Sequence, residues 1–199
     1  MKKLALTSLL AVFAVSGADA ATKYFVGGNA TIGTDNDHAT VLSVAPEFGW
    51  KLNSNWDLGV AANFGVDHKY LSRTYGVDGD TYTYGAGAFA RYKVAQMGGV
   101  KLLLKGSADL NFMTAVPEDD AIDSETLTTF DIAVVPMITY DLTESFTLYA
   151  NLNFLGLNAG YRFENEDMGI DSGWRFNAFA DSDNVANTGG FQIGFLYNF

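Results

Sequence analysis

The sequence predicts an all-β fold, an eight-stranded antiparallel transmembrane β-barrel of the up-and-down type. In about eight segments the apolar side chains fall on every second position, the period of a strand with one apolar face. The aromatic residues of these rows gather near their two ends, where bilayer interfaces favour them. Short turns alternate with long polar loops, as in barrels that cross a membrane.

The first twenty residues have the pattern of an export signal. Lys2 and Lys3 precede the apolar run from Leu4 to Val15, and a small-x-small motif ends at Ala20. The run is shorter than the roughly 20 residues that a spanning helix needs. We expect residues 1–20 to be a signal peptide cleaved after Ala20, without a lipoprotein cysteine, and residues 21–199 to form the barrel.

The composition excludes several classes of function. The chain has no cysteine, so neither disulfides nor thiolate metal sites contribute. Its formal net charge of −11 becomes roughly −12 once the signal is removed, and such a surface is a poor partner for nucleic acid. We expect no cofactor, and contact with polyanionic lipid only through bridging cations.

The strands follow one another without a domain boundary. They are expected near residues 22–33, 41–52, 56–64, 82–92, 102–112, 130–142, 146–154 and 191–199. Residues 53–55 form a tight turn by residue type, and an acidic loop covers residues 114–126. Pro46 and Pro136 fall inside strands, so we expect a bulge or a gap in the hydrogen-bond ladder at each.

The last strand ends on an aromatic residue. Its apolar positions are Phe191, Ile193, Phe195, Tyr197 and Phe199. An unpaired edge of this kind invites aggregation, and pairing with the first strand removes it.

The aromatic residues form two levels with an aliphatic waist between them. Beside short turns or a terminus lie Tyr24, Trp50, Trp56, Tyr92, Tyr140, Phe146, Tyr197 and Phe199. Beside long loops lie Phe64, Tyr82, Tyr84, Phe112, Phe130, Phe154 and Phe191. A soluble lipocalin-like cup has the same period with its apolar row inside, but its core has no reason to sort aromatics into two levels. We therefore place the apolar row, with Trp50, Trp56 and Tyr140, outside, and Glu47 and Arg91 inside.

The opposite row then fills the lumen with paired charges. Its charged members are Glu47, Lys51, Asp57, Arg91, Lys93, Lys101, Lys105, Asp109, Asp131 and Asp141. We expect Lys51 to face Asp57, and Glu47 to be shared by Arg91 and Lys105. Asp109 and Asp131 face one another as an acid/base pair, as a structural network with Lys105 between them, or as the gate of a small conductance.

Two motifs carry a resemblance to a known family. They are the segment from Val44 to Trp50, continued through Leu52, residues 53–56 and Leu58 to Val60, and the closing segment from Phe195 to Phe199. The mature chain resembles the small outer-membrane barrels of the OmpA/OmpX type, also grouped as the outer-membrane-protein β-barrel domain or porin family. The resemblance implies the outer membrane of a Gram-negative envelope, with periplasmic termini and lipopolysaccharide as a neighbour. It also implies that Phe195, Tyr197 and Phe199 are read by the barrel-assembly machinery.

Members of that family include surface adhesins, structural anchors and weak pores. We expect a structural or surface-interaction role, with the lumen filled by side chains and the long loops as the place for a surface ligand. The alternatives are a narrow porin-like channel for ions or small solutes and, less favoured, a lipid A-modifying enzyme. An enzyme of that kind needs a fixed histidine, and this chain has His38 and His68 in polar loops beside aspartates.

The long loops leave two further alternatives open. Their acidic residues are Glu118, Asp119, Asp120, Asp123, Glu125, Glu164, Glu166, Asp167, Asp171, Asp181 and Asp183. Such carboxylates bind Ca²⁺ or Mg²⁺ where their spacing allows, but no calcium-loop spacing occurs here, and solvated loops are the favoured interpretation. Trp174, Phe176 and Phe179 alternate with polar residues, which suggests a hairpin above the membrane.

Overall fold

The structure is a computed structural model that describes residues 24–34, 40–68, 79–119, 123–166, 169–180 and 191–199. It contains ten strands: β1 (Tyr24–Thr34), β2 (Thr40–Lys51), β3 (Trp56–Asp67), β4 (Gly79–Met97), β5 (Val100–Pro117), β6 (Glu125–Asp141), β7 (Phe146–Leu152), β8 (Leu155–Arg162), β9 (Gly173–Ala180) and β10 (Phe191–Asn198). Within these ranges no helix is long and apolar enough to cross a membrane. The predicted signal peptide and His38 lie outside the described residues.

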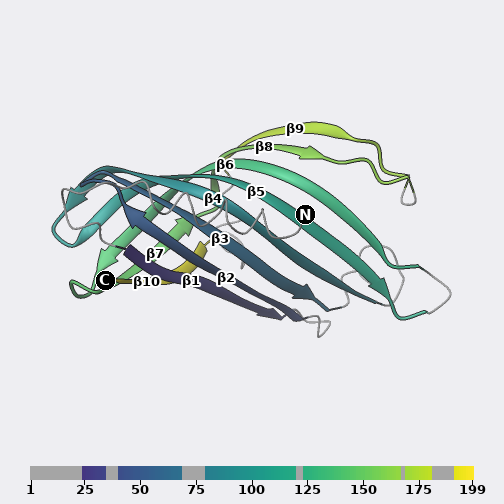
Figure 1. Ribbon diagram of the computed structural model, residues 1–199, viewed down its shortest axis with the longest axis horizontal. Helices are drawn as coiled ribbons and strands as arrows, with labels where there is room; N and C mark the ends of the chain where they lie inside the picture. The colour runs from purple at the N-terminus through teal and green to yellow at the C-terminus, as the bar shows by residue number, and fades with distance from the viewer. Residues whose placement is uncertain (1–23, 35–39, 69–78, 120–122, 167–168, 181–190) are drawn as a thin grey trace, which may run out of the picture.

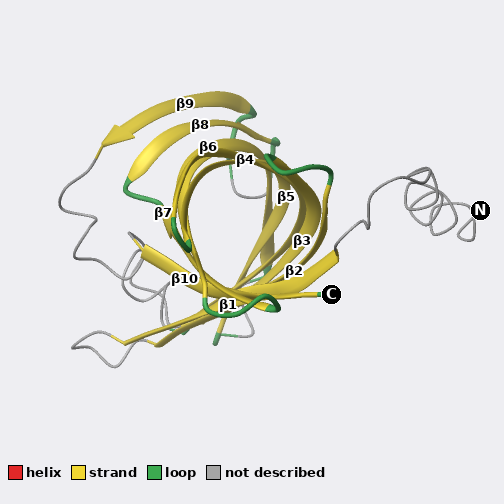
Figure 2. Cartoon of the chain, turned by 90° about the vertical axis from the view of Figure 1, so that its left-hand side faces the viewer, coloured by secondary structure: helices red, strands yellow, loops and turns green. Residues whose placement is uncertain are grey.

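Eight of the strands close into an antiparallel ring, which confirms the predicted fold class. Each of β1 to β6 pairs with its successor, and β6–β7, β7–β10 and β10–β1 complete the circle (Figure 2). The closing strand carries no free edge along this seam, because Tyr24 and Phe199 exchange two backbone hydrogen bonds of 2.9 Å.

The strands are tilted, as a closed ring requires. Pairing can be followed once around the ring through Asp141, Thr147, Leu196, Gly27, Glu47, Ala61, Gly87, Asp109 and Asp131. The path starts at Asp141 of β6 and returns to β6 at Asp131, ten residues away, so the shear number of the barrel is ten. At eight strands the interior is just wide enough for side chains to fill it.

The apolar row faces outward and the ionic row faces the lumen. Trp56 is 42% exposed and Tyr140 is 49% exposed, whereas Glu47 is 4% exposed and Arg91 is fully buried. The aromatic rings also contact one another at both levels, with centroids 4.8 Å apart for Trp56–Tyr92 and 5.3 Å apart for Tyr84–Phe112. This arrangement excludes the soluble cup, whose apolar row packs inside.

Three strands are longer than a bilayer requires. β4, β5 and β6 have 19, 18 and 17 residues, against 11 or 12 for β1 to β3. Beyond the pair Tyr84–Phe112 the β4–β5 ladder continues to Gly79–Pro117. The predicted acidic loop is therefore shorter than residues 114–126, because its flanks are strand.

The prolines interrupt the ladder in two different ways. Pairing of β2 with β3 skips Ala45 and Pro46 without a change of register. At Pro136 the interruption is larger. Met137 of β6 pairs with Asn151, and Val134 pairs with Leu157, so two residues of β6 lie opposite the five residues 152–156. Proline has no N–H to donate to the neighbouring strand, so the expected gap and bulge are both found.

After the bulge opposite Pro136 the chain forms the hairpin that the alternation of Trp174, Phe176 and Phe179 suggested, but at another level than expected. The predicted seventh strand ends at Leu152, Phe154 lies in the break instead of beside a long loop, and β8 resumes along β6. β9 pairs with β8, and both lie outside the ring (Figures 1 and 2). Phe130, Tyr161 and Trp174 are paired across β6, β8 and β9, so Trp174 lies level with the outer aromatic row and not above the membrane.

Candidate functional site: the filled lumen

Glu47 is the centre of a buried charge cluster. Arg91 Nη2 donates a hydrogen bond of 2.5 Å to Glu47 Oε1, and Lys105 Nζ lies 3.9 Å from Glu47 Oε2. The three side chains come from β2, β4 and β5, which are held in register by the β2–β3, β3–β4 and β4–β5 ladders. A carboxylate flanked by two cations is compensated for the water it loses.

Aromatic rings surround the guanidinium of Arg91. Its Cζ lies 4.5 Å from the ring centre of Phe89, 5.2 Å from that of Phe25 and 5.7 Å from that of Tyr149. Arg91 Nε and Nη1 have no hydrogen-bond partner among the described residues. The electron-rich ring faces therefore supply part of the stabilisation that water or oxygen atoms give elsewhere.

Two glycines make room for these rings. A Cβ at Gly49 would lie 2.3 Å from Phe25 Cζ, and a Cβ at Gly59 would lie 2.3 Å from Phe89 Cζ. Gly49 and Gly59 pair with one another across β2 and β3. The wall is thus thinnest where the two aromatic rings fill the lumen.

The buried apolar residues of the lumen form one cluster beside the ion pair. Its members are Phe25, Phe89, Leu103, Met137, Tyr149 and Leu196, each at most 5% exposed. The sequence did not reveal Leu103, Met137 and Leu196 as lumen residues, because their neighbours in the chain are also apolar and face outward. This part of the lumen is a packed core, which suits a barrel of this width.

Above the ion pair the lumen is polar and holds a cavity of about 190 Å³. Asn63 Nδ2 donates a hydrogen bond of 2.8 Å to Asn111 Oδ1, and Asn29 Nδ2 donates one of 3.2 Å to the hydroxyl of Tyr149. Glu47, Lys105 and Asp109 also line this cavity. The lumen is therefore a polar vestibule closed below by the ion pair and its rings.

Asp109 and Asp131 occupy paired positions on β5 and β6, but the cation that contacts Asp131 comes from elsewhere. Arg175 Nη2 on β9 donates a hydrogen bond of 2.6 Å to Asp131 Oδ1, and Thr129 Oγ1 donates one of 2.9 Å to Asp131 Oδ2. Lys105 contacts Glu47 instead of standing between the two aspartates. Sequence reasoning did not single out Arg175, because the hairpin pattern alone does not give the register that brings β9 across β8 to Asp131.

Nearer the short turns lie two further sets of charges. Lys101 Nζ donates a hydrogen bond of 2.6 Å to Asp141 Oδ2, and Thr147 Oγ1 donates one of 2.9 Å to Asp141 Oδ1. Lys51 and Asp57 are a register pair of β2 and β3 beside the turn at residues 53–55. The Lys101–Asp141 pair ties together the short-turn ends of β5 and β6.

His68 is placed beside a carboxylate, though not its neighbour in sequence. Its Nδ1 lies 2.6 Å from Asp80 Oδ1, across the outer ends of β3 and β4, with 45% of the histidine side chain exposed. In the part of the chain that the structure describes, no group of three His, Asp or Glu side chains could hold a metal ion. Asp120, Asp167, Asp181 and Asp183 lie outside the described residues.

The residues of the predicted assembly signal point outward. Phe195, Tyr197 and Phe199 are 53%, 43% and 60% exposed, and the rings of Tyr197 and Phe146 lie 5.4 Å apart. They form part of the lower aromatic row at the seam where the ring closes.

No protein-family model matches the chain, and no curated protein matches it in sequence. Several solved structures are similar, and three of them are compared with the chain in turn. Neisserial surface protein A (NspA) has 18% identity over 89% of this chain and 96% of that chain, with a TM-score of 0.49. A major outer membrane protein from Thermus thermophilus has 14% identity over 90% and 100%, with a TM-score of 0.49. Ail, the attachment invasion locus protein of Yersinia pestis, has 13% identity over 89% and 97%, with a TM-score of 0.41.

These likenesses concern the barrel fold alone, and the class of protein follows from the molecule itself. A closed antiparallel ring leaves no unpaired strand edge at its seam, its exterior is apolar between two aromatic rows, and its charges are enclosed. These are the features of a β-barrel that spans an outer membrane. The chain is an outer-membrane β-barrel.

Proposed function

We propose that the protein serves a structural or surface-interaction role, with a lumen that does not conduct. The buried Glu47–Arg91 pair, enclosed by Phe25, Phe89 and Tyr149, carries this proposal. A path for ions through this level would have to separate a fully buried guanidinium from its carboxylate, at the cost of an uncompensated charge. The molecule's contact with its surroundings then lies on its surface.

The long strands support the surface part of the proposal. β4, β5 and β6 continue beyond the outer aromatic row, where Thr114 and Thr126 are joined by a 2.9 Å hydrogen bond between their hydroxyl groups. A strand rises about 3.3 Å per residue, so the five residues beyond Phe112 reach roughly 15 Å further along the strand direction. Loops held on such a rigid wall are where binding residues concentrate.

A narrow channel is the second candidate. The polar vestibule and its carboxamide groups favour it, because a polar cavity is the first half of an ion path. Planar-bilayer recording of the purified protein separates the two candidates. We expect no steady conductance from the wild type, whereas a stable ohmic channel would show that the lumen is not filled.

The surface role needs its own measurement. Replacing residues 114–126 by a short turn removes the projecting end of β5 and β6 and leaves the ring residues unchanged. Cells that display this variant should bind host-cell matrix and neighbouring cells less than cells that display the full barrel. Equal binding at equal surface levels would place the interaction elsewhere.

An enzymatic role is less supported. His68 and Asp80 form a dyad, but both side chains are partly exposed, 45% for His68 and 27% for Asp80. We expect His68→Ala to leave the lipid A of the host unchanged, as measured by lipidomics against a deletion strain. We also propose lipopolysaccharide and the barrel-assembly machinery as partners, and cleavage after Ala20, which the mass of the mature protein would reveal.

A further inference from the structure

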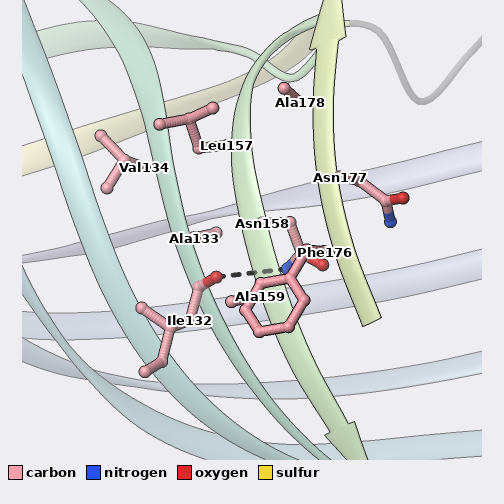
Figure 3. Close-up of a pocket in the computed structure, with 9 residues that line it drawn as sticks. All are labelled: Ile132, Ala133, Val134, Leu157, Asn158, Ala159, Phe176, Asn177 and Ala178. Atoms are coloured by element: carbon pink, nitrogen blue, oxygen red, sulfur yellow. Dashed lines mark hydrogen bonds between the residues drawn. The ribbon is translucent and has the colours of Figure 1, made fainter. Parts of the chain in front are cut away.

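A hollow lies on the outward face of β6, β8 and β9, away from the lumen. It has a volume of about 360 Å³, within the roughly 300–1,000 Å³ of ligand pockets. Its apolar lining consists of Ile132, Val134, Leu157, Ala159, Phe176 and Ala178 (Figure 3).

Register explains the shape of the hollow. Val134, Leu157 and Ala178 are paired in one row, and Ile132, Ala159 and Phe176 are paired in the next. Ala159 and Ala178 therefore lie on one diagonal, and the large side chains of Leu157 and Phe176 lie on the other. Leu157 is 59% exposed and Phe176 is 74% exposed, against 44% for Ile132 and 40% for Val134. Leu157 and Phe176 therefore stand above the surrounding wall and flank a recess whose floor is alanine.

The position of the hollow identifies what occupies it. Ile132 and Val134 belong to the outward row that faces lipid, and the hollow continues that surface. It begins two residues from Tyr161, which together with Trp174 marks the outer aromatic row. At about 3.3 Å per residue its two rows lie roughly 7 and 13 Å from that row along the strand, in the outer half of a hydrocarbon layer about 30 Å thick.

The chemistry of the hollow agrees with its depth. Its two polar members are Asn158 and Asn177, which pair across β8 and β9, and the Asn158 amide nitrogen donates a hydrogen bond of 3.4 Å to the backbone oxygen of Ile132 (Figure 3). Nine residues line the hollow, far fewer than the roughly 20–30 per side of a stable protein interface. The contact area thus suits a narrow apolar chain and not a second folded copy.

We propose that this hollow is a binding site for one acyl chain of an outer-leaflet lipid, which is held there longer than the lipids elsewhere around the barrel. Leu157 and Phe176 flank the chain, and Ala159 and Ala178 leave the space for it. The proposal rests on the membrane placement of the barrel, but it adds a defined lipid position that a smooth barrel wall would not have.

Tryptophan fluorescence tests the proposal, because the chain has three tryptophans and Trp174 stacks on Phe176 with ring centres 6.1 Å apart. W50F/W56F leaves Trp174 beside the hollow, and W50F/W174F leaves Trp56 on the lower aromatic row as the control. Each variant is placed in dioleoylphosphatidylcholine vesicles containing increasing fractions of a lipid A with brominated acyl chains, which quench on contact, so that the outer-leaflet lipid competes with the host lipid for the hollow. We expect half-maximal quenching of Trp174 at a fraction about tenfold lower than for Trp56, equivalent to about 1.4 kcal/mol.

Filling the hollow supplies the matched comparison. In the Trp174-only background, Ala159→Leu or Ala178→Leu should abolish the preference, whereas Ala88→Leu, on the outward row of β4, should leave it unchanged. Identical curves for Trp174 and Trp56, or filled variants that still show the preference, would overturn the site. Loss of quenching at high protein-to-lipid ratio together with cross-linked dimers would assign the hollow to a second copy instead. Absence of quenching at Trp56 as well would overturn the membrane placement itself, which distinguishes the two failures.

Discussion

At the scale of single residues, the Glu47–Arg91 pair controls how the lumen is filled. Glu47→Ala leaves the guanidinium of Arg91 buried with its rings and without its 2.5 Å carboxylate partner. Removing one partner of such a pair costs about 3–5 kcal/mol, because the remaining charge is uncompensated. We expect a loss of this size in the free energy of unfolding, measured by urea titration of the barrel in vesicles.

The control for this prediction removes both charges. E47A/R91M replaces the pair by apolar volume between Phe25 and Phe89, and it should recover most of the lost stability. If the double variant were as unstable as Glu47→Ala, the loss would arise from packing and not from the unpaired charge. Lys105, 3.9 Å from Glu47, stays in place in both variants.

The glycines of the wall provide a second prediction. Gly59→Ala places a Cβ 2.3 Å from Phe89 Cζ and 2.6 Å from Phe48 O, so the ring must move within a packed lumen. Overpacking of this kind costs about 1–3 kcal/mol. Gly65→Ala, on the same strand, meets its nearest atom at 3.4 Å and should change the free energy of unfolding by less than about 0.5 kcal/mol. Equal effects of the two substitutions would contradict the role of Gly59 in making room for Phe89.

At the scale of elements, the β8–β9 hairpin depends on a contact that crosses a strand. Asp131 of β6 pairs with Gly160 of β8, which pairs with Arg175 of β9. A Cβ at Gly160 would lie 2.5 Å from Asp131 Oδ1 and 2.6 Å from Arg175 Nε. The missing side chain therefore lets the guanidinium reach the carboxylate over the intervening strand.

Loss of this contact should loosen β9 without opening the ring. Arg175→Gln removes the 2.6 Å ion pair, and we expect faster amide hydrogen exchange along β9 with little change in β2 and β3. Arg162→Gln is the matched control, since among the described residues the Arg162 guanidinium donates to a backbone oxygen, that of Asp171 at 3.3 Å, and not to a carboxylate. The same exchange rates in both variants would show that Asp131 does not hold the hairpin.

The same elements show what alternation of residues predicts and where it stops. The period of two located the eight ring strands, because a one-residue slip would turn every side chain to the wrong face. It suggested a hairpin at Trp174, Phe176 and Phe179, but it did not show that the chain would pair again with β6 after a break at residues 153–154, since that break lies opposite Pro136 on another strand. It made β4, β5 and β6 too short at their long-loop ends, because apolar and polar residues no longer alternate strictly there.

For the lumen, the sequence predicted the charged residues better than their partners. Glu47, Arg91 and Lys105 were placed together because their strands are adjacent through β3 and all three face inward. Asp131 was expected to face Asp109, with Lys105 between them as one alternative, whereas the cation that contacts it is Arg175 of β9. The buried apolar cluster was missed because Leu103 and Met137 lie beside apolar residues that face outward. Where consecutive residues are all apolar, the sequence does not show which of them face the lumen.

At the scale of the whole molecule, the remaining prediction concerns which end of the barrel faces the outside. The chain has no cysteine, so single cysteines report on their surroundings without background. Ser54 lies in the short turn before β3, and Ser124 lies just before β6 at the opposite end, and both are exposed. Short turns of outer-membrane barrels face the periplasm and long loops face outward.

We therefore expect a membrane-impermeant maleimide to label Ser124→Cys in intact cells and Ser54→Cys only after the outer membrane is permeabilised. Because the two positions are matched in residue type and exposure, a difference in labelling reports on the side of the membrane and not on reactivity. The reverse pattern would invert the barrel and place the β4–β6 extension in the periplasm. It would also move the hollow beside Phe176 to the inner leaflet, so this measurement fixes the orientation on which both the surface role and the lipid site depend.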